Sequence, residues 1–137
     1  MNNDQRVVVI TGCSSGFGYL TALKFAREHC LVYAGVRNLE SAGALELKEI
    51  AVRENLALRL IKIDVTDDNS VMAAVARVQQ EAGRVDTLVN NAGFGYLGPV
   101  ETFSINEVKD QFETNVFGLL RMVKAVVPLM RATETFG

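Results

Sequence analysis

The stretch from Val7 to Gly18, VVVITGCSSGFG, constrains the fold of this chain more than any other part of it. It opens with a run of β-branched residues, Val7 to Thr11, which is typical of a parallel strand buried on both faces. Three glycines and two serines follow within seven residues, and a helical composition resumes from Tyr19 to Glu28. The order predicted here is strand, glycine-rich turn, helix.

A glycine-rich turn between a buried strand and a helix suits a phosphate ligand. Glycine allows positive φ and lets an anion approach main-chain N–H groups, and the helix N-terminus adds unpaired donors and a partial positive charge. The hydroxyls of Ser14 and Ser15 can supply further donors. A tight turn without a ligand is the simpler alternative, but three glycines and two serines together favour a pyrophosphate site.

The rest of the chain continues the alternation of strand and helix. We expect further strands over residues 31–36, 58–63 and 85–90, and helices over 16–29, 39–54 and 104–131, with Asn38 and Thr66 as candidate caps. A further helix carries an apolar face of Val71, Ala74, Val75 and Val78 and ends at Gly83. Right-handed crossovers between parallel strands then give the order 3-2-1-4. The sequence predicts one α/β domain over residues 1–137, a Rossmann-like doubly wound parallel sheet.

The last predicted helix carries an asparagine among its apolar residues. Ser104 and Glu107 form a capping box at its start, and an apolar stripe runs from Ile105 to Val126. Asn115 lies on this stripe, so its amide needs a partner in backbone, water or ligand. A structural role at a helix irregularity and a functional role are equally compatible with this position.

Composition excludes several classes of function. Of 137 residues 49% are apolar and 22% are charged, and the net charge of −2 gives no electrostatic footprint for nucleic acid or an anionic membrane. Charged residues interrupt every apolar stretch before it reaches membrane-spanning length, and residues 1–6 lack the core of a signal peptide. We therefore expect a cytoplasmic protein that binds small molecules or other proteins.

Cysteine and histidine are too scarce for metal chemistry. Cys13 and Cys30 lack the spacing of zinc or redox motifs and are expected to be free thiols. His29 is the only histidine, and its place at a helix end is typical of a surface residue. We expect neither a metal site nor a Ser-His-Asp triad.

Polar residues follow the ends of the other predicted strands. Arg37 comes directly after the second strand, where an acidic residue would bind ribose hydroxyls and an arginine would accommodate a 2′-phosphate. Asp64 follows the third strand, where it can accept from an adenine amino group or begin a turn. Asn90-Asn91-Ala92-Gly93 follows the fourth, where backbone can pass close to a ribose. Arg37 favours NADP(H), although an ordinary solvated arginine is the alternative.

These segments together resemble the successive N-terminal motifs of the short-chain dehydrogenase/reductase family: TGCSSGFG at 11–18, Asp64, NNAG at 90–93 and TNVFG at 114–118. The GCSSG turn with Arg37 is further similar to NADP-using members that act on hydroxysteroids or retinoids. The resemblance implies a cofactor site made by Gly12, Ser14, Ser15, Gly16, Phe17, Gly18, Arg37, Asp64, Val65, Asn90, Asn91, Ala92 and Gly93. It also implies that Asn115 belongs to the family's Asn-Ser-Tyr-Lys catalytic group, with its backbone holding a water in the proton relay.

The rest of that catalytic group is missing from these residues. In the family the serine follows a fifth strand and a Tyr-x-x-x-Lys pair lies on the next helix, whereas this sequence ends at Gly137 and none of Tyr19, Tyr33 and Tyr96 has lysine four residues later. We expect the N-terminal half of an NADP(H)-dependent oxidoreductase for a ketone, aldehyde or alcohol, truncated before the fifth strand. The alternative is a non-catalytic dinucleotide-binding or partner-binding fragment. Helix 104–131 is a candidate surface for homo-oligomer formation.

Overall fold

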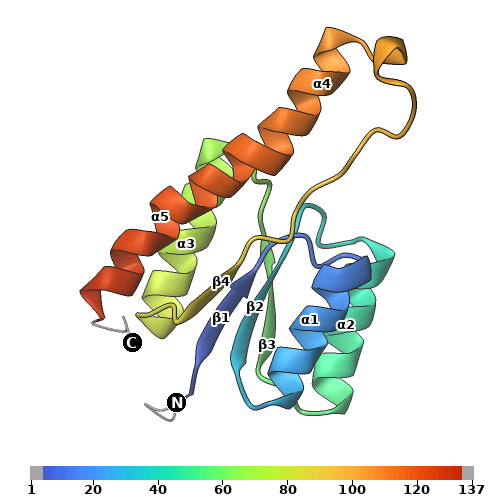
Figure 1. The fold of residues 1–137 in the computed structure, drawn as a ribbon. Coiled ribbons are helices and arrows are strands. Elements are labelled where there is room, and N and C mark those ends of the chain that lie inside the picture. Colours follow the sequence, from blue (N-terminus) through green and yellow to red (C-terminus); the bar gives the residue numbers. More distant parts are fainter. Residues whose placement is uncertain (1–4, 134–137) are drawn as a thin grey trace.

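A computed structural model describes residues 5–133 of the chain (Figure 1). Four parallel strands, β1 (Val7–Ile10), β2 (Leu31–Val36), β3 (Leu58–Lys62) and β4 (Thr87–Val89), form a sheet in the order β3-β2-β1-β4. Helices α1 (Gly16–Arg27) and α2 (Ala42–Arg53) cover one face, and α3 (Asp68–Ala82) and α5 (Leu119–Ala132) cover the other. The predicted α/β fold and strand order are confirmed.

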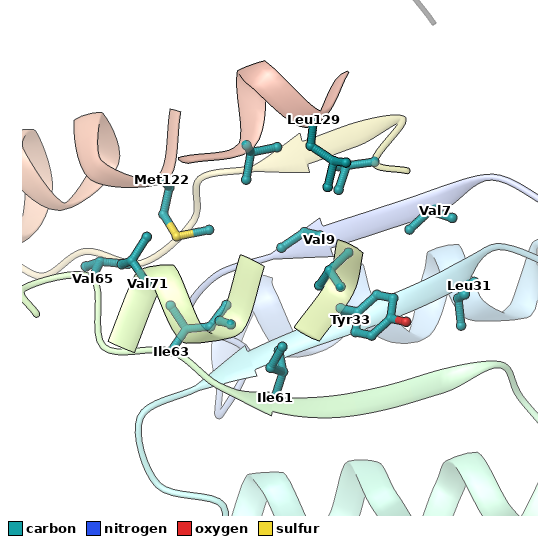
Figure 2. Close-up of a cluster of buried hydrophobic side chains, with 14 residues drawn as sticks. Val7, Val9, Leu31, Tyr33, Ile61, Ile63, Val65, Val71, Met122 and Leu129 are labelled. Carbon is teal, nitrogen blue, oxygen red and sulfur yellow. The ribbon is translucent and has the colours of Figure 1, made fainter. Parts of the chain in front are cut away.

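The central strand is buried on both faces because its side chains alternate between two apolar cores. Val7 and Val9 pack with residues of α3 and α5 in the core drawn in Figure 2. Val8 and Ile10 pack on the other side against α1 and α2. All four side chains are at most 3% exposed, which explains why β1 reads as an unbroken run of β-branched residues.

Two predicted helix caps are wrong. Helix α2 begins at Ala42 rather than Leu39, because the Ser41 hydroxyl accepts from the Ala44 N–H at 3.4 Å and forms the N-cap. Asn38 instead accepts from the Glu40 N–H at 2.9 Å and makes a turn before the helix.

At α3 the cap is Asp67 and not Thr66. The Asp67 carboxylate accepts from the backbone N–H groups of Asn69 and Ser70. The C-terminus of α3 is as predicted, with Gly83 in the left-handed conformation at φ 71°.

The predicted helix over 104–131 is helical throughout but changes type. It consists of α4 (Ile105–Phe112), a π-helical segment η2 (Glu113–Gly118) and α5, and a short 3₁₀ turn η1 (Val100–Thr102) precedes it. The capping box of Ser104 and Glu107 is present in full.

Burial of the apolar stripe is limited to the second half of this helical stretch. Met122 and Val126 are fully buried, whereas Ile105 is 70% and Phe112 53% exposed. The two halves differ because α5 lies against the sheet, whereas α4 projects past the end of the sheet (Figure 1).

Both cysteines are buried free thiols, as expected. Burial raises the pKa of the Cys13 thiol to about 12, so this side chain stays protonated at neutral pH and behaves as a small apolar group. Within residues 5–133, no helix has the length and apolar character needed to cross a membrane.

Candidate functional site

A cleft of about 600 Å³ lies at the carboxyl end of the sheet. In doubly wound α/β folds this edge is where ligands bind, because the strand-to-helix connections diverge there. The cleft is lined by residues from the connections after all four strands and from η2: Gly12, Ser14, Ser15, Phe17, Arg37, Ile63, Asp64, Val65, Thr66, Asn91, Ala92, Gly93, Phe94 and Thr114.

The glycine-rich turn presents an uncapped helix N-terminus beside this cleft. Ser15 is the N-cap residue of α1 and has extended backbone, yet its side chain makes no cap hydrogen bond, and the first turn contains no acidic residue. The first N–H groups of α1 therefore have no side-chain acceptor. Such donors, together with the positive end of the helix dipole, favour an anion.

Two glycines of the turn meet different requirements. Gly12 has φ 72°, and a Cβ there would lie 2.8 Å from the Cα of Ala92, so only glycine lets the turn approach the segment after β4. Gly16 has φ 59° and a Cβ there would meet no atom within 4 Å. At Gly16 the requirement is conformational, and the space beside its backbone is open.

A reciprocal set of hydrogen bonds joins the ends of β1 and β4. The Thr11 hydroxyl accepts from the backbone N–H groups of Asn91 at 3.1 Å and Ala92 at 3.0 Å. In return, the Asn91 amide donates to the carbonyl oxygens of Thr11 at 3.1 Å and Gly12 at 3.0 Å. These bonds fix one wall of the cleft to the glycine-rich turn.

The opposite wall carries Arg37 and Asp64. Arg37 is exposed directly after β2, and among residues 5–133 no carboxylate forms a salt bridge with its guanidinium. Asp64 accepts from the Thr66 hydroxyl at 2.7 Å and from the Thr66 N–H at 3.0 Å. These bonds lower the pKa of Asp64, with the charges of Arg37 and Lys62 adding to the effect. The carboxylate thus both makes a turn and lines the cleft.

Asn115 lies in η2 and holds the loop that follows β4. Its amide donates to the Phe94 carbonyl at 2.6 Å and its carbonyl oxygen accepts from the Phe94 N–H at 3.0 Å. Gly93 leaves room for this pairing, because a Cβ there would lie 2.9 Å from Asn115 Oδ1. Asn115 itself does not line the cleft, but its neighbour Thr114 does. The structural alternative for Asn115 is therefore present, and π-helical turns are frequent at functional sites.

Most of the residues that the sequence predicts for the cofactor site line the cleft, and Gly16, Gly18 and Asn90 do not. Gly18 is buried beneath the turn, where a Cβ would overlap the Gly12 carbonyl oxygen and the Asn91 amide. Its absence of a side chain serves the packing of α1 against the turn.

Four lining residues are not among those predicted for the cofactor site: Ile63, Thr66, Phe94 and Thr114. Ile63 and Thr66 flank Asp64 at the end of β3, so the rule that ligands meet strand ends would have included them. Thr114 begins the TNVFG motif at 114–118, of which only Asn115 was assigned to the site, and it lies in the π-helical segment η2. Residues 5–133 contain no group of three His, Cys, Asp or Glu side chains placed to hold a metal ion.

Comparisons with known proteins agree with this geometry. A family model described as short chain dehydrogenase matches residues 6–136. The chain is 41% identical over 128 residues to retinol dehydrogenase 8 of Homo sapiens, covering 92% of this chain and 40% of that protein. It is 42% identical over 134 residues to estradiol 17-beta-dehydrogenase 1 of Rattus norvegicus, covering 93% and 38%.

A solved structure shows the same fold. Gluconate 5-dehydrogenase from Burkholderia cenocepacia, crystallised with NADP and tartrate, superposes with a TM-score of 0.83 at 28% identity over 93% of this chain and 49% of that one. The chain thus spans about 40% of the length of the two curated relatives and about half of this solved one. The family model covers nearly all of the chain, and the chain belongs to the short-chain dehydrogenase family.

Proposed function

We propose that this chain supplies the cofactor site of an NADP(H)-dependent oxidoreductase, which moves hydride reversibly between a nicotinamide and a ketone, aldehyde or alcohol. One observation carries the proposal. The uncapped N-terminus of α1 and the guanidinium of Arg37, which has no salt bridge within residues 5–133, line a single cleft at the sheet edge. Two separate anion-binding features suit a ligand that has a pyrophosphate and a further phosphate.

The residues of the cleft fit such a cofactor. The backbone of the turn from Gly12 to Gly18, with the Ser14 and Ser15 hydroxyls, would hold the pyrophosphate, and Arg37 would hold the 2′-phosphate. The segment Asp64–Val65 would meet the adenine, and residues 90–93 would flank the ribose. A cleft of about 600 Å³ is within the size range of cofactor sites. The bound cofactor would supply the hydride donor or acceptor.

The relatives support the cofactor and the substrate class. Gluconate 5-dehydrogenase was crystallised with NADP, and it shares the fold of this chain at 28% identity. Retinol dehydrogenase 8 and estradiol 17-beta-dehydrogenase 1 are named for oxidation of alcohols. We propose an alcohol or carbonyl compound of hydroxysteroid or retinoid type as the substrate of the enzyme to which this chain contributes.

A second candidate function is dinucleotide binding without chemistry. The observation that favours it is the absence of a Tyr-x-x-x-Lys pair from the 137 residues. A carbonyl cannot be reduced without a group that exchanges a proton as hydride moves, and a tyrosine with a lowered pKa is suited to that task. Both proposals expect zero turnover of a carbonyl panel by these 137 residues alone, and measurable turnover by a chain that binds NADPH would exclude this second candidate.

Fluorescence titration of the 137-residue chain with NADPH and NADH tests the cofactor proposal. We expect tighter binding of NADPH, and Arg37→Asp should remove that preference by weakening NADPH binding about 10- to 100-fold, the value of one charge-assisted contact. Arg131→Asp is the matched control, since it makes the same charge change at an exposed position at the far end of α5. Equal affinities in the wild type would contradict the NADP(H) preference, and binding of neither nucleotide would contradict the whole proposal.

The exposed apolar face of α4 supports association of this chain with a second copy. Ile105 and Phe112 lie on this face, and apolar patches of this kind mark interaction surfaces. Size-exclusion chromatography at several concentrations tests this. A concentration-dependent shift to a larger species is expected, and a monomer at every concentration would contradict it.

A further inference from the structure

Helix α2 contacts the glycine-rich turn through Gly43, in its first turn. A Cβ on Gly43 would overlap the carbonyl oxygen of Ser14 and lie 2.8 Å from the Ser14 carbonyl carbon. These are backbone atoms, so rotation of the Ser14 side chain cannot make room. Gly43 is not among the glycines with positive φ, so the helix itself does not require glycine here. The contact with Ser14 is what requires it.

Glycine is otherwise unfavourable at this position. Within a helix, alanine is preferred over glycine because glycine loses more backbone freedom on folding. The residues on either side of Gly43 are Ala42 and Ala44, and Ser41 already provides the N-cap. The close approach of α2 to the turn is therefore achieved at a cost to the intrinsic stability of the helix.

The same contact determines where the connection carrying Arg37 can lie. Only residues 37–41 separate the end of β2 from the start of α2. Within them, the Asn38 side chain accepts from the Glu40 N–H at 2.9 Å, and the Asn38 carbonyl accepts from the Ser41 N–H at 3.2 Å. One end of this short connection is fixed by the sheet and the other by the packing of Gly43 on Ser14.

We infer that Gly43 is a positioning residue for discrimination between NADP(H) and NAD(H). By letting α2 pack on the Ser14 carbonyl, it sets the spacing between Arg37, which would hold the 2′-phosphate, and the glycine-rich turn, which would hold the pyrophosphate. Gly43 does not line the cleft and acts through these residues. The inference rests on the proposed NADP(H) site and adds to it a residue that controls selectivity from α2.

The test compares the dissociation constants of NADPH and NADH for wild type, Gly43→Ala and Ala42→Gly. Gly43→Ala adds one methyl group at the contact, and Ala42→Gly makes the reverse exchange at the neighbouring exposed position, away from it. We expect Gly43→Ala to weaken NADPH binding at least tenfold and NADH binding by much less, so that the preference for NADPH falls. Ala42→Gly should leave the preference within about twofold of the wild type.

Circular dichroism and thermal unfolding establish whether each variant is folded. If Gly43→Ala does not fold, Asn38→Ala decides, because this exposed substitution removes the side-chain hydrogen bond to the Glu40 N–H that helps to hold the connection, without altering the Ser14 contact. It is expected to lower the preference for NADPH at least threefold. An unchanged preference in a folded Gly43→Ala, or in Asn38→Ala where that variant decides, overturns the inference. Failure of the wild type to prefer NADPH contradicts instead the proposed function on which the inference rests.

Discussion

Asn115 pairs with the backbone of Phe94 through both ends of its side-chain amide, at 2.6 Å to the carbonyl and 3.0 Å from the N–H. The pairing connects the π-helical segment η2 to the loop after β4. Phe94 in turn packs edge-on against Tyr96, with ring centroids 5.3 Å apart. One amide thus anchors the start of the loop that borders the cleft.

Asn115→Leu should detach this loop from η2. Two hydrogen bonds are lost, each worth about 1 kcal/mol, so we expect the free energy of unfolding to fall by about 1–3 kcal/mol. Amide hydrogen exchange at Phe94 and Tyr96 should also become faster. Asn106→Leu, at an exposed position of α4, is the matched control. Equal effects of the two substitutions on urea denaturation and on exchange would show that the pairing does not hold the loop.

The Thr11 hydroxyl should stabilise the fold, because its oxygen accepts hydrogen bonds from two backbone N–H groups. Thr11 is 1% exposed, so Thr11→Val would keep the shape but remove the acceptor of the Ala92 N–H, whereas the Asn91 N–H would keep its second acceptor, the Val89 carbonyl at 3.1 Å. One unsatisfied donor costs about 1–3 kcal/mol, so we expect the free energy of unfolding of Thr11→Val to fall by about that amount. Thr11→Ser keeps the hydroxyl, so its free energy of unfolding should fall much less than that of Thr11→Val. Chemical denaturation of both variants measures this, and a Thr11→Val protein as stable as Thr11→Ser would count against the arrangement.

The acid stability of the protein should depend on Glu81. Hydrogen bonds from Arg77, Arg59 and the Tyr33 hydroxyl lower the pKa of the Glu81 carboxyl to about 2. The unfolded chain binds that proton near pH 4.3, at about the ordinary value for glutamate. The stabilisation is therefore complete above this pH and is lost as the pH falls from about 4.3 to about 2.

Glu81→Gln removes the titrating group and tests this dependence. Over this acidic interval the free energy of unfolding should fall less steeply in the variant than in the wild type, because one carboxylate fewer takes up a proton on unfolding. Glu49→Gln on the exposed face of α2 serves as the control. Urea titrations at a series of pH values provide the measurement, and parallel curves for wild type and Glu81→Gln would contradict the role given to Glu81.

The sheet and its ligand edge could be predicted from sequence because they depend on local and repetitive signals. The β-branched run of β1 indicates a strand buried on both faces. Gly83 indicates the end of α3 because glycine readily adopts the left-handed conformation that it has there. The turn at Gly12 to Gly18 could be placed at the sheet edge because strand-to-helix turns in parallel sheets all lie there.

The sequence does not determine a feature where two neighbouring residues could both cap a helix, or where a distant contact is involved. Asn38 and Ser41 are both good caps, and the structure uses Ser41, so the helix begins at Ala42. Thr66 and Asp67 compete in the same way. Asn115, in the π-helical segment, pairs with Phe94 21 positions away, and no local sequence pattern predicts a contact between residues so far apart.

The central claim is that the cleft at the carboxyl edge of the sheet binds a nicotinamide dinucleotide, and an NADPH titration of the ¹⁵N-labelled chain followed by two-dimensional NMR tests it most directly. We predict saturable shifts of the backbone amides of Gly12 to Gly18, Arg37, Val65 and Asn91, with little change at the far ends of α3 and α5. An unchanged spectrum at millimolar NADPH, or shifts confined to residues outside this cleft, would contradict the account.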